Sequence, residues 1–139
     1  MDHLHFTKRY FFHAILIPLM VFTASLKAQD SKIESLASQG YSYRFTDSAK
    51  AKQMLNNALL LARKSNSKKD EAICLAFLAL TYRRLNSPKE FNNYAEQAYK
   101  ISSQTNDERA KAYAYMVMGN LKSYFDENTA ALNYQLQAN

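Results

Sequence analysis

A short pattern of small and apolar residues recurs in this sequence at one fixed interval. It reads Ala51-x-x-x-Leu55-x-x-Ala58, and its later copies begin at Phe91 and at Ala131. The distance from position 51 to 91, and again from 91 to 131, is 40 residues. A constant interval of roughly 20–50 residues is typical of a repeat array, whose units bury their apolar faces only by stacking on their neighbours. We therefore expect a stacked scaffold that presents a binding surface and does not carry out catalysis.

The composition predicts that the repeats are helical. The chain has only two Gly and two Pro residues, whereas Ala, Leu, Lys, Gln and Glu, which favour helices, are common. Helix-start signals occur at Ser31, at Thr46-Asp47, at Ser87-Pro88 and at Thr105, where a hydroxyl or carboxylate can cap free backbone N–H groups. These signals predict helices over residues 32–45, 48–65, 69–85, 88–103, 107–125 and 128–139. Short connections such as Asn86-Ser87 then require neighbouring helices to form antiparallel hairpins.

The packing of the helices follows from the same patterns. The segment 69–85 is apolar on nearly all sides, as expected of a central helix that touches neighbours on both sides. The small residues Ala58 and Ala98 allow helix backbones to approach closely. Cys74 lies inside this apolar segment, and we interpret it as a small buried hydrophobic residue rather than a reactive thiol.

One hairpin carries a resemblance to a known family. Leu78-Ala79-x-x-Tyr82, followed by Phe91-x-x-x-Ala95, resembles the tetratricopeptide repeat, whose signature is Leu-Gly-x-x-Tyr and then Ala-x-x-x-Phe. The chain departs from the family in its 40-residue period, in the exchanged positions of the small and large residue at 91 and 95, and in the first helix of the first unit. The resemblance implies an α-α superhelix of about three hairpins, a right-handed stack with a concave face. The expected units are 31–66, 67–105 and 106–139.

The resemblance also implies where a partner would bind, because the first helix of each pair lines the concave face in this family. Ala76 and Leu80 are expected on this face, and the candidate partner-binding residues are Arg83, Arg84, Tyr113, Asn120 and Tyr124. Two adjacent guanidinium groups can grip a carboxylate through paired hydrogen bonds. The alternative is that the arginines are solvated charges at a helix end. A protein or peptide is the expected partner.

Residues that carry catalytic chemistry are scarce. All three His residues precede position 14, the chain has one Cys, and Gly40 and Gly119 stand alone. We therefore expect no enzymatic activity, no metal site and no cofactor. A dense basic group, made up of Arg63, Lys64, Lys68 and Lys69, is interpreted as a solvated surface or, alternatively, as an anion-binding patch.

The first 28 residues read as a secretory signal peptide. Lys8 and Arg9 precede an apolar stretch over residues 10–25, and small residues lead to Ala28. The alternative is an uncleaved anchor, but the stretch contains Pro18 and is shorter than the roughly 20 residues of a spanning helix. We expect a helical domain over 29–139 that is exported to the periplasm or cell envelope of a bacterium. Nucleic acid is then excluded as a partner, and membrane contact is expected only for an uncleaved segment or an anchored longer parent chain.

The C-terminal helix lacks features that close a repeat array. We expect it to be shorter than its equivalents and to lack the polar capping helix that repeat arrays need. Its apolar side, which includes Leu132 and Leu136, would then favour self-association through the open end. An alternative function follows: the chain is the N-terminal periplasmic sensory region of a signal-transduction protein, either a sensor histidine kinase or a transcriptional regulator.

Signal-peptide cleavage is tested by N-terminal sequencing. Protein recovered from the periplasm is expected to begin near Gln29, because the small residue Ala28 precedes the cut. A membrane-retained product that begins at Met1 would contradict the prediction.

Overall fold

The computed structural model describes residues 28–125 and 128–139. The predicted signal segment therefore lies outside the described residues, apart from Ala28. The chain divides into two units, Met1–Lys32 and Ile33–Asn139. The packing and the cavities described below belong to the second unit.

The described residues form an all-α fold, with no strand in residues 28–125 and 128–139. Residues 28–43 are helical, and the later helices are α2 (Ser48–Lys64), α3 (Lys68–Arg84), α4 (Pro88–Ser102), α5 (Glu108–Tyr124) and α6 (Asn128–Ala138). The predicted bounds agree to within a few residues. The predicted start at Ser31 is wrong, because residues 28–30 are already helical and place Ser31 inside the helix.

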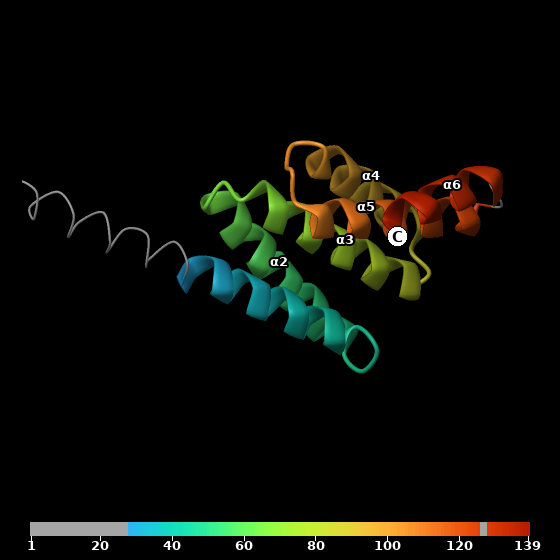
Figure 1. The fold of residues 1–139 in the computed structure, drawn as a ribbon. Helices are drawn as coiled ribbons and strands as arrows, with labels where there is room; N and C mark the ends of the chain where they lie inside the picture. Colours follow the sequence, from blue (N-terminus) through green and yellow to red (C-terminus); the bar gives the residue numbers. More distant parts are fainter. Residues whose placement is uncertain (1–27, 126–127) are drawn as a thin grey trace, which may run out of the picture. The chain divides into compact units, whose positions relative to one another are not determined.

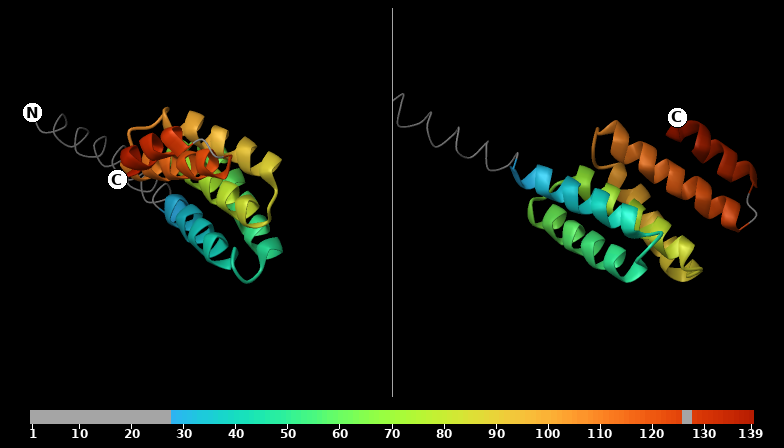
Figure 2. Two further views of the ribbon diagram at one scale, coloured as in Figure 1. Left: turned by 90° about the vertical axis from the view of Figure 1, so that its right-hand side faces the viewer. Right: turned by 90° about the horizontal axis from the view of Figure 1, so that it is seen from below.

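Successive helices pair as antiparallel hairpins, and the hairpins stack on one another (Figure 1). The central helix α3 contacts α2, α4 and α5, and α5 also contacts α4 and α6. The second helices of the hairpins begin at Ser48, Pro88 and Asn128, and the first helices α3 and α5 begin at Lys68 and Glu108, so each set repeats after 40 residues. Figure 2 shows the hairpins following one another in chain order. The interval found in the sequence is thus the repeat of the structure.

The core is centred on α3. Every residue from Asp70 to Ala79 is buried, because other helices cover this helix on several sides. Aromatic side chains also pack in this region. The ring of Tyr41 in the first helix stacks on that of Phe77, with ring centroids 4.1 Å apart, and the ring of Tyr113 in α5 meets Phe77 edge-on at 4.9 Å. These three aromatic residues join three consecutive hairpins.

The recurring pattern marks the buried face of the second helix in each hairpin. In α2 and α4 all six pattern residues are fully buried: Ala51, Leu55, Ala58, Phe91, Ala95 and Ala98. In α6 the equivalent Gln135 is exposed and Ala138 is partly buried. The side chain of Ala131 lies outside the described residues. The pattern therefore predicts burial where a further hairpin packs on the helix.

Two turns between helices, one that joins two hairpins and one within a hairpin, have the same backbone geometry. Asn66 and Asn86 have positive φ values of 56° and 53°, a left-handed conformation that Asn adopts more readily than most residues. At the first turn, the N–H of Ser67 donates to the carbonyl of Ala62 at 2.9 Å, and the N–H of Asn66 donates to that of Arg63 at 3.1 Å. This pair of bonds is the Schellman motif, which satisfies carbonyl groups at a helix end.

The same two bonds recur at Asn86, where the N–H of Ser87 donates to the carbonyl of Tyr82. Both turns thus read Asn-Ser, and the Ser is in each case the N-cap of the following helix. The spacing from 66 to 86 is half of the 40-residue period.

The helix caps agree only partly with the predicted signals. The side chain of Asp47 accepts from the N–H of Lys50 at 2.9 Å, as expected. Ser87 is the N-cap of α4, but its side chain makes no capping hydrogen bond, and Pro88 occupies the first turn. Asp107, rather than Thr105, caps α5 by accepting from the N–H of Ala110.

Substitution of Ala98 tests the packing between hairpins. Ala98→Leu adds bulk to a fully buried position and is expected to reduce the free energy of unfolding by about 1–3 kcal/mol. The matched control is Glu96→Leu, at an exposed position of the same helix. Thermal unfolding should show a midpoint several degrees lower for the first variant only. An unchanged midpoint for Ala98→Leu would contradict the close approach.

Candidate functional site

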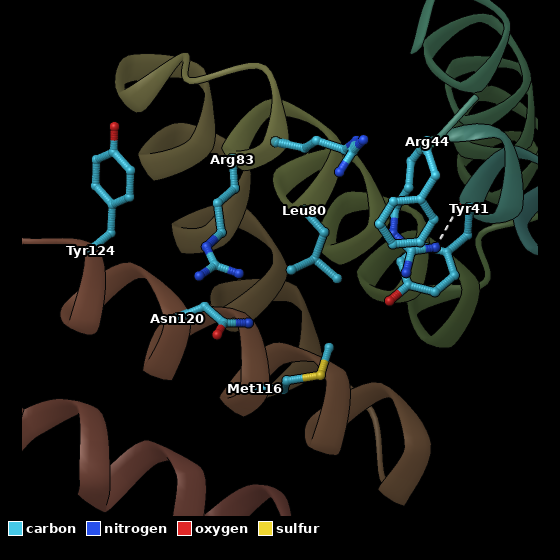
Figure 3. Close-up of a pocket in the computed structure, with 9 residues that line it drawn as sticks. Tyr41, Arg44, Leu80, Arg83, Met116, Asn120 and Tyr124 are labelled. Carbon is cyan, nitrogen blue, oxygen red and sulfur yellow. Dashed lines mark hydrogen bonds between the residues drawn. The ribbon is translucent and has the colours of Figure 1, made fainter. Parts of the chain in front are cut away.

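A cavity of about 540 Å³ lies between the end of the first helix, α3 and α5. We call it the groove. Its lining consists of Tyr41, Arg44, Phe45, Leu80, Arg83, Arg84, Met116, Asn120 and Tyr124. Figure 3 shows these side chains converging from three consecutive hairpins. The groove is therefore formed by the first helix of each pair together with the turn that follows residue 43.

The charge of the groove lining is positive. Among the described residues of the lining, Arg44, Arg83 and Arg84 contribute to it, and no Asp or Glu does. Among the described residues, none of these three guanidinium groups forms an ion pair, whereas Arg63 and Arg109 each contact a carboxylate at 2.9 Å. The groove thus concentrates positive charge that the described part of the chain leaves without an ionic partner.

Aromatic rings hold two of the arginines. The guanidinium carbon of Arg44 lies 3.4 Å from the ring centroid of Tyr41 and 3.8 Å from that of Phe45, and its Nη1 donates to the carbonyl of Tyr41. The guanidinium carbon of Arg84 lies 4.8 Å from the same Phe45 ring. Stacking of this kind restricts a guanidinium group while its edge stays available for hydrogen bonds.

The opposite wall is formed by α5. The hydroxyl of Tyr124 donates to Oδ1 of Asn86 at 2.7 Å, and its ring meets Phe91 edge-on at 5.8 Å. Arg83 and Asn120 point toward one another across the space between α3 and α5 (Figure 3). The α5 wall therefore presents two uncharged hydrogen-bonding side chains, Asn120 and Tyr124, and Arg83 of α3 faces it.

Four of the five predicted partner-binding residues, namely Arg83, Arg84, Asn120 and Tyr124, line the groove. Tyr113 does not, because it packs edge-on against Phe77 and lines a separate cavity of about 40 Å³. Ala76, which was expected on the same open face, is fully buried.

Sequence reasoning missed Tyr41, Arg44 and Phe45. These residues belong to the first predicted repeat, 31–66. Its first helix does not match the family pattern, so the pattern did not assign these residues to the concave face. The adjacent aromatic and basic residues Tyr43-Arg44-Phe45 were the available signal.

Comparison with models of known protein families, with curated proteins and with solved structures gave no match. Within the described residues, no helix is both long enough and apolar enough to cross a bilayer. No three His, Cys, Asp or Glu side chains gather into a possible metal site in that part of the chain.

Cys74 lies beside the smaller cavity and is fully buried. Burial, together with the negative charges of Asp70 and Glu71, raises the pKa of its thiol to about 12. A thiol with this pKa stays protonated at neutral pH, and the thiolate is the nucleophilic form. The interpretation of Cys74 as a buried hydrophobic residue is confirmed.

The basic group around residues 63–69 is partly neutralised. Arg63 Nε and Lys68 Nζ each lie 2.9 Å from a carboxylate oxygen of Glu71, and Lys69 Nζ lies 4.0 Å from Asp70 Oδ1. Three of the four cations thus face carboxylates of α3. An anion bound by this group would compete with Glu71 and Asp70 for these cations, so the contacts favour the solvated-surface interpretation over the alternative of an anion-binding patch.

Glu71 links α2 to α3. Its carboxylate is nearly buried, and burial alone opposes ionisation. Hydrogen bonds from Lys68 and Arg63, together with their positive charges, outweigh this effect and hold the pKa of Glu71 below its ordinary value.

The last helix exposes part of its apolar surface. Leu136 is 66% exposed, whereas Tyr134 packs against Tyr99 and Tyr115 with ring centroids 5.7 and 6.4 Å apart. The side chain of Leu132 lies outside the described residues. Self-association through this helix stays a prediction.

The Glu71 ion pairs are expected to make stability depend on pH. Because its pKa is lower in the folded chain, Glu71 contributes stability above its unfolded pKa of roughly 4.3, and this contribution is lost as the pH falls through the folded pKa. Glu71→Gln should reduce the free energy of unfolding by about 1–2 kcal/mol at neutral pH and much less under acidic conditions.

Urea unfolding at neutral and acidic pH measures the effect. Glu96→Gln, which removes an exposed carboxylate from α4, is the matched control. An equal loss for Glu71→Gln at both pH values would show that its hydrogen bonds, rather than its charge, stabilise the contact between α2 and α3.

Proposed function

We propose that this protein is a non-catalytic scaffold, exported from the cytoplasm, that binds a segment of a partner protein in the groove. One observation carries the proposal: side chains from three consecutive hairpins converge on one cavity of about 540 Å³. Ligand sites in proteins commonly have volumes of about 300–1,000 Å³. A cavity made jointly by stacked repeats is also the surface that repeat arrays use for binding.

The chemistry of the groove supports a peptide segment as the occupant. Leu80 and Met116 provide apolar contact near the centre, and Arg83, Asn120 and Tyr124 provide hydrogen-bonding groups around it. Protein interfaces combine an apolar centre with a polar rim in this way, and they are enriched in Arg, Tyr and Met.

The proposed export rests on the charged, apolar and small residues over positions 8–28. The single Cys is buried and its thiol has a pKa of about 12, which argues against nucleophilic catalysis by this residue. Membership of the tetratricopeptide repeat family is proposed from the recurring pattern and the hairpin spacing. A sensory region of a signal-transduction protein would use the same groove, and this alternative stays a prediction.

Selection from a random peptide library tests the proposal. The full chain, immobilised on a surface, is expected to enrich peptides that bind with micromolar affinity. Asn120→Trp should weaken their binding by about tenfold or more, because the larger side chain fills the cavity. Asn57→Trp, at an exposed position of α2 outside the groove, is the matched control.

If Asn120→Trp lowers the thermal midpoint, Leu80→Gln tests the same point without added bulk. The absence of any enriched peptide would overturn the proposed function, and so would equal binding by the groove variants and the control.

A further inference from the structure

We propose that the groove selects partner segments in which Asp or Glu side chains alternate with apolar side chains, and that Arg44, Arg83 and Arg84 bind the carboxylates. This inference rests on the proposed function and adds the chemical class of the partner.

The distribution of ion pairs carries the first step. Arg63 and Arg109 contact Glu71 and Glu34 at 2.9 Å, whereas the three groove arginines have no carboxylate within ion-pair distance in the described part of the chain. They line one cavity, and none of the described residues in its lining is acidic. Their mutual repulsion is relieved when a partner supplies negative charge.

The geometry of the arginines carries the second step. Phe45 is 57% exposed, and the guanidinium carbons of Arg44 and Arg84 lie 3.8 and 4.8 Å from its ring centroid. A stacked guanidinium group presents its edge N–H groups in the fork that matches a carboxylate. Because the rings already restrict Arg44 and Arg84, a carboxylate that binds them has less side-chain motion to arrest.

The remainder of the lining favours a peptide over other anions. Leu80 and Met116 lie between the two arginine positions, Arg44 at one end and Arg83 near Asn120 at the other (Figure 3). A peptide that alternates acidic and apolar side chains covers both kinds of surface. Free phosphate would leave the apolar residues uncovered, and single-stranded nucleic acid needs cations that follow its backbone along an extended path.

Fluorescence anisotropy with two synthetic probes tests the inference. The first probe is a short peptide in which Glu and Leu alternate, and the second carries Gln in place of every Glu. The full chain is expected to bind the Glu peptide at least about tenfold more tightly, as charge-assisted hydrogen bonds require. The preference should disappear in Arg83→Gln/Arg84→Gln and in Arg44→Gln.

The matched control, Lys64→Gln/Lys100→Gln, removes the same charge as the double variant at exposed positions outside the groove and should keep the preference. Circular dichroism and thermal unfolding check that each variant is folded. Should Arg44→Gln disturb the Tyr41 and Phe45 contacts, the double variant, at exposed positions, decides the result.

Equal binding of both peptides would overturn the inference, and so would loss of the preference in the control variant. It would also be overturned if inorganic phosphate or a single-stranded oligonucleotide displaced the Glu peptide at a lower concentration than unlabelled peptide does. Enrichment of peptides without acidic residues in the library would also overturn it and would leave the proposed function intact. Failure of the library to enrich any groove-binding peptide would remove both.

Discussion

The burial of α3 on several sides is the constraint on which the described fold depends. The run from Ala72 to Ala79 has no polar face, so this helix is stable in water only while α2, α4 and α5 cover it. A small domain is stable by only about 5–15 kcal/mol in total. The loss of one covering helix would therefore expose enough apolar surface to unfold α3 as well.

This arrangement also creates the groove. The middle of α3 is enclosed, but its last turn, with Arg83 and Arg84, is exposed. The first helix and α5 flank it and are joined directly by the ion pair between Glu34 and Arg109. The groove therefore lies at the exposed end of α3, and the two neighbouring hairpins form its walls.

Much of the fold could be predicted from the sequence, because helix periodicity, caps and the 40-residue interval are local signals. The pattern residues of α2 and α4 are buried as predicted, whereas Gln135 in α6 is exposed, since burial depends on a neighbour as well as on a pattern. In the groove, Arg83 and Asn120 were found through a family register. Arg44 and Phe45 were missed because their place depends on how the first hairpin packs. The carboxylates that pair with the basic group at residues 63–69 belong to Asp70 and Glu71, which are close to it in sequence. The contacts could not be predicted, because they depend on the conformation of the turn between α2 and α3.

Asn86 has two structural roles that are usually separate. Its backbone adopts the left-handed conformation that closes the turn between α3 and α4, and its side chain accepts the hydroxyl hydrogen of Tyr124 on the groove wall. Gly would serve the first role equally well but could not serve the second. The residue that closes this turn therefore also fixes the position of a side chain on the groove wall that belongs to a different hairpin.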